Sequence, residues 1–246
     1  MTYDELSFRF KHNKFANNYL RPVLRPIVRA LIWPFVNKRR KKEKEARHSD
    51  FLHNGQDLLA RFNSAMKNAG IDYWLDFGTL LGAYREHGLI KHDMDFDVGA
   101  FYADRKNIEK TLLDAGFRLI RQLEVVGRPE LGFEQTYEYK GVPIDVFYYH
   151  IHADEATMHC NSFSCSANDY HLFQVKEITF PYTGFAKMKF LGETVSVPKD
   201  CVAHLKVPYG ENFMTPDPHY DYRKTCKSLR WIPIEEYFGR KTINLD

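Results

Sequence analysis

The chain has 246 residues, 44% of them hydrophobic and 27% charged, a globular composition that excludes a collagen-like, coiled-coil or fully disordered chain. Its four cysteines are too few for a disulfide-stabilised scaffold of this length, so we expect a reducing compartment. Charge is unevenly placed, because residues 1–50 carry 13 Lys or Arg against 5 Asp or Glu, whereas residues 51–246 carry 22 against 27.

The basic arm is assigned to residues 1–48. Its segment 22–36 is mostly apolar, but two arginines and three prolines interrupt it, and it is shorter than the about 20 apolar residues that span a bilayer. Six cations follow at close intervals: Lys38, Arg39, Arg40, Lys41, Lys42 and Lys44. We therefore predict an interfacial element, residues 22–47, that docks a cytoplasmic protein peripherally on an anionic membrane.

Two other interpretations of the arm stay open. The basic run can be a solvated linker after a helix that packs on the body. A contact with nucleic acid is the less favoured of the two, because aromatic side chains do not alternate with the cations to stack on bases.

Residues 49–246 predict a domain in which helices and strands alternate. A helix is expected from residue 49 or 50 to about residue 67, and a short one over 80–86 after a tight turn at Gly78–Thr79. Strands are expected at 72–77, 92–101, 117–126, 133–139 and 142–149, with a further helix after Asp104. This alternation indicates an α/β or α+β sheet.

The pattern weakens after residue 149, and we interpret residues 150–180 as an insertion with few apolar runs. Order returns in the tail. A hairpin is expected over 187–197 around Gly192, and a short helix over 200–205.

Three carboxylates alternate along the expected strand 92–101. Side chains alternate between the two faces of a strand, so Asp93, Asp95 and Asp97 are expected to share one face. Like charges this close repel unless a cation lies among them, and hard divalent metals prefer oxygen ligands. We therefore predict a metal site, although an exposed edge strand that uses charge against aggregation is the alternative.

A fourth carboxylate, Asp145, interrupts the otherwise apolar strand 142–149. An aspartate in a core-like strand needs a partner. A metal shared with Asp95 and Asp97 would be one, and a structural salt bridge, for example with an arginine, would be another.

The segment from Asp76 to Gly99 contains a GTLLG run, an arginine and the acidic strand. It resembles the signature of the LicD (fukutin-like) family within the polymerase-beta-like nucleotidyltransferase superfamily. The element around Asp145 and the segment 209–214 also resemble later parts of that family. His92 and Met94 depart from it, standing where the family usually has Trp and often a further Asp.

This resemblance implies an α+β, nucleotidyltransferase-type fold, with a mixed β-sheet flanked by helices. It also implies a phosphotransferase that moves phosphocholine, ribitol phosphate or a similar group from a CDP-linked donor to a glycan or lipid-linked glycan, releasing CMP. The expected catalytic residues are Asp95, Asp97 and Asp145, which with Asp93 would hold Mg²⁺ or Mn²⁺. Asp145 is the candidate general base, unless a metal-bound hydroxyl loses its proton without it.

The donor is expected to contact the segment that contains Gly78, Thr79 and Arg85. The glycine lets the backbone approach a pyrophosphate, the threonine can donate its hydroxyl, and the amides that open the next helix favour anions. Arg85 can face either the donor or a structural carboxylate.

A second metal is a separate hypothesis. A structural Zn²⁺ would use four residues of the 150–180 segment: His159, Cys160, Cys165 and His171. Free thiols and surface histidines are the alternative.

Two further functions stay open. One is a nucleotidyl- or adenylyltransferase that acts on protein or RNA, with the same fold. The other is a membrane-attached scaffold with a degenerate site.

Overall fold

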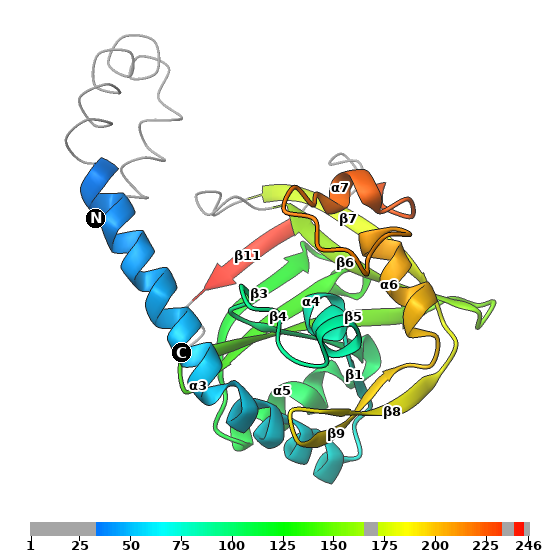
Figure 1. Cartoon of the computed structure of the whole chain (residues 1–246). Helices are drawn as coiled ribbons and strands as arrows, with labels where there is room; N and C mark the ends of the chain where they lie inside the picture. Colours follow the sequence, from blue (N-terminus) through cyan, green and yellow to red (C-terminus); the bar gives the residue numbers. More distant parts are fainter. Residues whose placement is uncertain (1–32, 165–171, 233–238, 244–246) are drawn as a thin grey trace.

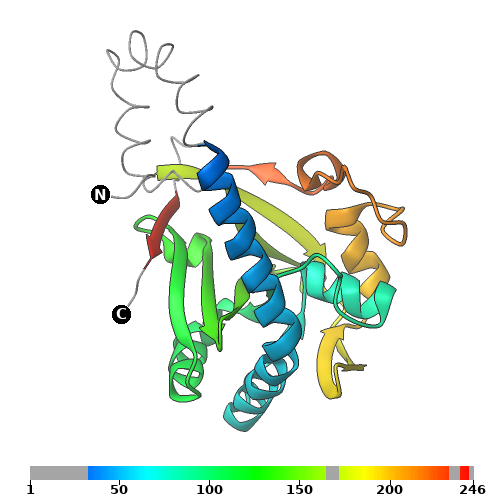
Figure 2. The ribbon, with the colours of Figure 1, turned by 60° about the vertical axis from the view of Figure 1, so that its left-hand side comes forward.

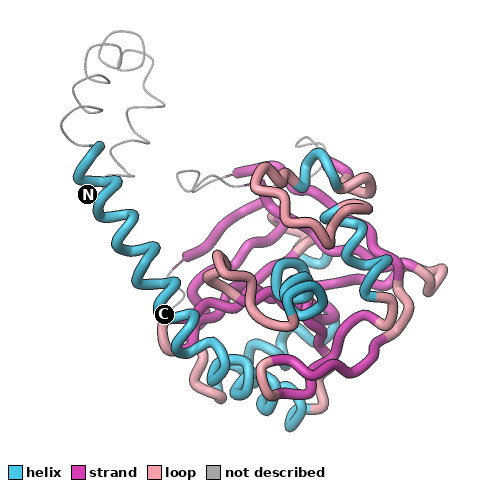
Figure 3. Tube along the Cα trace, viewed as in Figure 1, coloured by secondary structure: helices cyan, strands magenta, loops and turns pink. Residues whose placement is uncertain are grey.

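The computed structural model describes residues 33–164, 172–232 and 239–243. Most of the apolar segment 22–36 and the residues Cys165 and His171 lie outside this part of the chain. Strands occupy the middle of the molecule and helices flank them (Figure 3). The expected α+β class, with a mixed sheet flanked by helices, is confirmed.

The main sheet contains nine strands of the described chain. These are β1 (Tyr73–Leu75), β2 (Phe96–Phe101), β3 (Arg118–Val125), β4 (Phe133–Tyr139), β5 (Val142–Ile151), β6 (Thr157–Ser164), β7 (Leu172–Pro181), β10 (Arg230–Trp231) and β11 (Gly239–Ile243). Their order is β1-β2-β5-β4-β3-β11-β7-β10, and β6 pairs with both β5 and β7. Strands β2 and β5 pair in parallel, and the other pairs are antiparallel.

Helices and short turns connect these strands. They are α3 (Trp33–Ala69), α4 (Phe77–Leu81), the π-helix η3 (Gly82–Glu86), the 3₁₀ turns η4 (Tyr102–Asp104) and η5 (Pro129–Leu131), α5 (Arg105–Asp114), α6 (Cys201–Tyr209) and α7 (Tyr222–Thr225). A separate hairpin of β8 (Phe185–Phe190) and β9 (Glu193–Pro198) confirms the expected one around Gly192. Helix α6 likewise confirms the expected short helix over 200–205.

Helix α3 is longer than the sequence predicts, because it includes the basic run. Lys, Arg and Glu are good helix formers, and the i,i+4 pairs Arg39–Glu43 and Lys41–Glu45 support the exposed half. Figure 1 shows this half standing away from the body. Nothing interrupts the helix between residues 48 and 49, where we placed the end of the arm.

The second half of α3 packs on the body, beside α5, β5 and β9. Its buried side chains recur on one face and meet the apolar face of the sheet: Phe51, Leu58, Leu59, Phe62 and Met66. The rings of Phe51 and Phe96 lie 5.1 Å apart. Figure 2 shows α3 as one continuous helix along the molecule. No helix in the described ranges is long and apolar enough to cross a membrane.

Two local predictions near the acidic segment are wrong. Strand β2 begins only at Phe96, so Asp93 and Asp95 precede it instead of alternating within it; aspartate is disfavoured in strands, and β2 pairs with β5 only from Phe96 onward. The expected turn at Gly78–Thr79 is part of α4, because the Asp76 side chain caps this helix by accepting from the Phe77 N–H at 2.8 Å.

Residues 150–180, which we interpreted as an insertion with few apolar runs, are more regular than their sequence pattern indicates. The described part of this segment forms β6 and β7, which belong to the main sheet. The pattern was weak because these strands bury polar side chains, among them Asn161 and Lys176, so apolar and polar residues do not alternate.

Candidate active site

The acidic site is built around two neighbouring parallel strands. Asp97 on β2 and Asp145 on β5 are register partners, and side chains at such positions point to the same face about 5 Å apart. Asp95, just before β2, lines a cavity of about 230 Å³ together with Asp145. The structure therefore brings Asp95, Asp97 and Asp145 together from segments about 50 residues apart in the sequence.

Gly78 leaves room beside two carboxylates, those of Asp97 and Asp93. A Cβ atom at this position would lie 3.1 Å from Asp97 Oδ2 and 3.4 Å from Asp93 Oδ2. The Gly78 N–H donates to Asp97 Oδ2 at 3.0 Å, and the buried Thr79 hydroxyl accepts from the Asp97 N–H at 2.7 Å. Both groups that we assigned to the donor thus hold Asp97 in place, and their contact with a donor stays a prediction.

The four predicted carboxylates repel one another. Burial raises the pKa of Asp93 to about 6, and the charge of Asp95 adds to this. Burial raises the pKa of Asp97 well above its ordinary value, with the charges of Asp95, Asp145 and Asp76 contributing. Desolvation, followed by the charge of Asp145, raises the pKa of Asp95. A divalent cation would relieve this repulsion.

Asp145 also has partners of its own. Its Oδ2 accepts from Arg121 Nη2 at 2.9 Å, and its Oδ1 accepts from the Thr136 hydroxyl. Arg121 Nη2 further donates to the buried Glu134 at 2.8 Å. The salt bridge that we left open for Asp145 is therefore present, with Arg121 shared between Asp145 and Glu134.

Arg85 makes a structural contact. Its guanidinium donates to the Phe213 carbonyl at 3.1 Å and pairs with Glu86, and its charge partly offsets the raised pKa of Asp93. It thereby links η3 to the 209–214 segment at the edge of the acidic site.

Asp76 is a residue of the site that was not among those predicted from the sequence. Its fully buried carboxylate accepts from the Tyr149 hydroxyl at 2.6 Å and from His204 Nε2 at 2.8 Å, and its N–H donates to the Asp97 carbonyl at 3.0 Å. An aspartate between a strand and a helix is an N-cap signature that the sequence displays, but its remote partners are not evident there.

The proposed zinc ligands are only partly described. His159 and Cys160 are consecutive on β6, so their side chains point to opposite faces. His159 hydrogen-bonds His152 at 2.7 Å, whereas Cys160 is buried. Within the described ranges, no group of three or more His, Cys, Asp or Glu side chains is arranged so that it could hold a metal ion. Both the zinc and the Mg²⁺ or Mn²⁺ hypotheses remain predictions.

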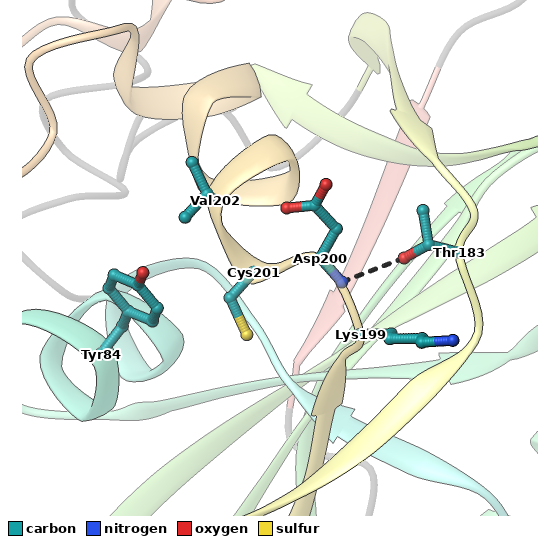
Figure 4. Close-up of a pocket in the computed structure, with 6 residues that line it drawn as sticks. All are labelled: Tyr84, Thr183, Lys199, Asp200, Cys201 and Val202. Carbon is teal, nitrogen blue, oxygen red and sulfur yellow. Dashed lines mark hydrogen bonds between the residues drawn. The ribbon is translucent and has the colours of Figure 1, made fainter.

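A second cavity of about 510 Å³ lies where η3 meets α6 (Figure 4). Six residues line it: Tyr84, Thr183, Lys199, Asp200, Cys201 and Val202. Asp200 caps α6 by accepting from the Ala203 N–H, and its own N–H donates to the Thr183 hydroxyl. None of the four predicted metal ligands lines this cavity.

The mixed sheet and the carboxylates on its two parallel strands define a nucleotidyltransferase-type domain. The sequence model of the LicD/FKTN/FKRP nucleotidyltransferase domain matches residues 70–200, more than half of the chain. The chain belongs to this family, as the motif between Asp76 and Gly99 predicts.

Several characterised and uncharacterised proteins are similar to this chain. The ribitol-5-phosphate transferase FKTN of Mus musculus is 27% identical and that of Homo sapiens 26%, each over 76% of this chain and 40% of the relative. The uncharacterised protein T07A5.1 of Caenorhabditis elegans is 26% identical over 85% of this chain and 56% of its own length. The chain thus spans about 40% of the FKTN relatives.

Among solved structures, the lincosamide antibiotic adenylyltransferase LnuA in complex with lincomycin is similar. The TM-score is 0.37 with 13% identity, and the match covers 58% of this chain and 78% of that one.

Proposed function

We propose that this protein is a metal-dependent phosphotransferase, which moves a phospho-alcohol from a CDP-linked donor to a hydroxyl of a glycan or lipid-linked glycan and releases CMP. The observation that carries the proposal is the register of Asp97 with Asp145, with Asp95 beside them. Ribitol phosphate is the first candidate group, because the similar FKTN proteins are ribitol-5-phosphate transferases; phosphocholine is the next.

The donor set fits Mg²⁺ or Mn²⁺. Carboxylate oxygens are the ligands that these ions prefer, and two of them face the space that Gly78 leaves open. Asp93, Asp95, Asp97 and Asp145 would hold the ion or ions, and a bound cation would supply positive charge for the phosphate oxygens. Asp145 would have to loosen its bond to Arg121 to join them.

The chain's own residues have separate roles in this proposal. Gly78 and Thr79 hold Asp97 at the start of β2. Both oxygens of Asp145 accept hydrogen bonds, from Thr136 and Arg121. Asp145 must therefore exchange one partner before it can take a proton from the acceptor. We propose that its main role is to supply negative charge and to position its neighbours, and that acting as the general base is its second role.

The exposed half of α3 suits an anionic membrane. All six cations of the basic run are solvent-exposed on this helix, and each is worth about 1 kcal/mol near an anionic leaflet. We include in the proposal a peripheral attachment to the cytoplasmic face, which would bring the acidic site to a lipid-linked acceptor.

Mass spectrometry of the acceptor tests the proposed reaction. The protein is incubated with a divalent cation, a glycan acceptor and CDP-ribitol or CDP-choline. An acceptor mass increased by one phospho-alcohol, together with free CMP, is the expected result. An acceptor mass increased by cytidylate would contradict the proposal, because attack would then fall on the nucleotide phosphorus.

A further inference from the structure

One residue of helix α3 reaches the acidic site from outside the family match. Arg47 lines the same 230 Å³ cavity as Asp95, Arg121 and Asp145. It comes from the helix that carries the basic run and precedes residues 70–200, which the family model matches. The cavity is therefore completed by a segment beyond the matched domain.

The turn of α3 that carries Arg47 is held in place by contacts of two neighbouring residues. Phe51, one turn later, is buried against Phe96 at the start of β2. His48 lies next to Arg47 and donates from Nδ1 to the Asp93 carbonyl at 3.2 Å. These two contacts hold this turn of α3 against the acidic segment, and Arg47 on the same turn lines the cavity.

The two arginines of the cavity differ in what they already bind. Arg121 pairs with Asp145 and Glu134. Arg47 is solvent-exposed and makes no ion pair within 4 Å among the described residues, although its charge partly offsets the raised pKa of Asp95. A divalent cation bound to the carboxylates would neutralise the negative charge that now attracts both arginines. The two guanidinium groups would then attract an anionic ligand in place of the carboxylates.

We infer that Arg47 and Arg121 form a subsite for the diphosphate of a nucleoside diphosphate ligand, beside the predicted metal ligands. A planar guanidinium donates two parallel hydrogen bonds to phosphate oxygens, which a lysine cannot do. The inference rests on the proposed function, because the diphosphate would be that of the CDP-linked donor. It assigns Arg47 a part in donor binding, distinct from the six cations assigned to the membrane.

Calorimetric binding of CDP in the presence of Mg²⁺ tests the subsite with the full chain. Arg47→Ala should weaken CDP binding by about tenfold or more, and Arg47→Lys should lose less. Inorganic pyrophosphate, which carries the diphosphate alone, should show the same order. The matched control is Arg40→Ala, which removes an exposed arginine seven residues earlier on the same helix face and should leave CDP binding unchanged.

Mg²⁺ binding without nucleotide separates donor binding from a merely structural role. Arg47→Ala removes a positively charged side chain near the carboxylates, so the variant should bind Mg²⁺ as tightly as the wild type or more tightly. Three results would overturn the inference. The Arg47→Ala variant could lose as much affinity for Mg²⁺ as for CDP, or it could bind CDP as tightly as the wild type. The third is a wild-type protein that binds neither CDP nor pyrophosphate. Transfer is assayed separately: CDP binding that depends on Arg47 without any transfer rejects the proposed function alone.

Discussion

His204 on α6 donates from Nε2 to the Asp76 carboxylate at 2.8 Å, across 128 positions of the chain and with both side chains almost fully buried. Tyr149 donates to the other oxygen of the same carboxylate. Because the Asp76 N–H in turn donates to the Asp97 carbonyl at 3.0 Å, the network connects α6 to the start of the acidic strand.

Asp76→Asn should destabilise the protein and lower its activity. The change leaves the capping position occupied but removes an acceptor from a buried network, which costs about 1–3 kcal/mol of unfolding free energy. Urea denaturation measures this cost. Asp114→Asn is the control, because that carboxylate lies on the surface of α5 in an exposed pair with Lys110 and should change stability by less than about 1 kcal/mol. Equal stability of the two variants would show that the network contributes little.

Asp95→Asn and Asp97→Asn should each lower transfer by about 100-fold or more while the fold persists, because a neutral amide cannot replace a charged metal ligand. Asp93→Asn should cost less, since Asp93 is neither in register with Asp145 nor in the cavity that Asp95 and Asp145 line. Circular dichroism checks the fold, and calorimetry with Mg²⁺ and Mn²⁺ checks the metal. Folded variants with near wild-type turnover would reject the metal site.

Gly78→Ala should impair activity through the carboxylates. The added Cβ would lie 3.1 Å from Asp97 Oδ2, so the carboxylate must shift and its bond from the Gly78 N–H must lengthen. We expect transfer to fall by about tenfold, with weaker Mg²⁺ binding. Gly88→Ala is the matched control, since the nearest atom to its Cβ would be 3.8 Å away. If the two variants performed alike, crowding at Gly78 would not matter.

Replacement of the six basic-run cations by glutamine should weaken binding to phosphatidylserine-containing vesicles. This variant keeps Arg47, so turnover on a soluble glycan acceptor should stay near wild type. Raised salt should release the wild-type protein too, because the attraction between exposed charges is screened. Sedimentation with neutral phosphatidylcholine vesicles is the control. Undiminished binding of the variant would place the membrane contact elsewhere on the chain.

Much of the local architecture can be predicted from residue order alone. The positions of β4, β5, the β8–β9 hairpin and α6 follow from apolar periodicity and turn residues, because such patterns arise from neighbours in sequence. The same holds for the prediction that Asp95, Asp97 and Asp145 lie close together, since an aspartate in an apolar strand needs a partner. The motif between Asp76 and Gly99 was sufficient to identify the family.

Contacts between residues far apart in the sequence could be identified only in the folded structure. The bonds from His204 and Tyr149 to Asp76, the pairing of Arg121 with Asp145, and the approach of Arg47 to the cavity join residues 24 to 128 positions apart or from separate elements. No periodicity encodes them, because each depends on how whole helices and strands pack. For the same reason Gly78 and Thr79 proved to hold Asp97: a capped helix brings their N–H and hydroxyl groups against the next strand, and only packing sets that distance.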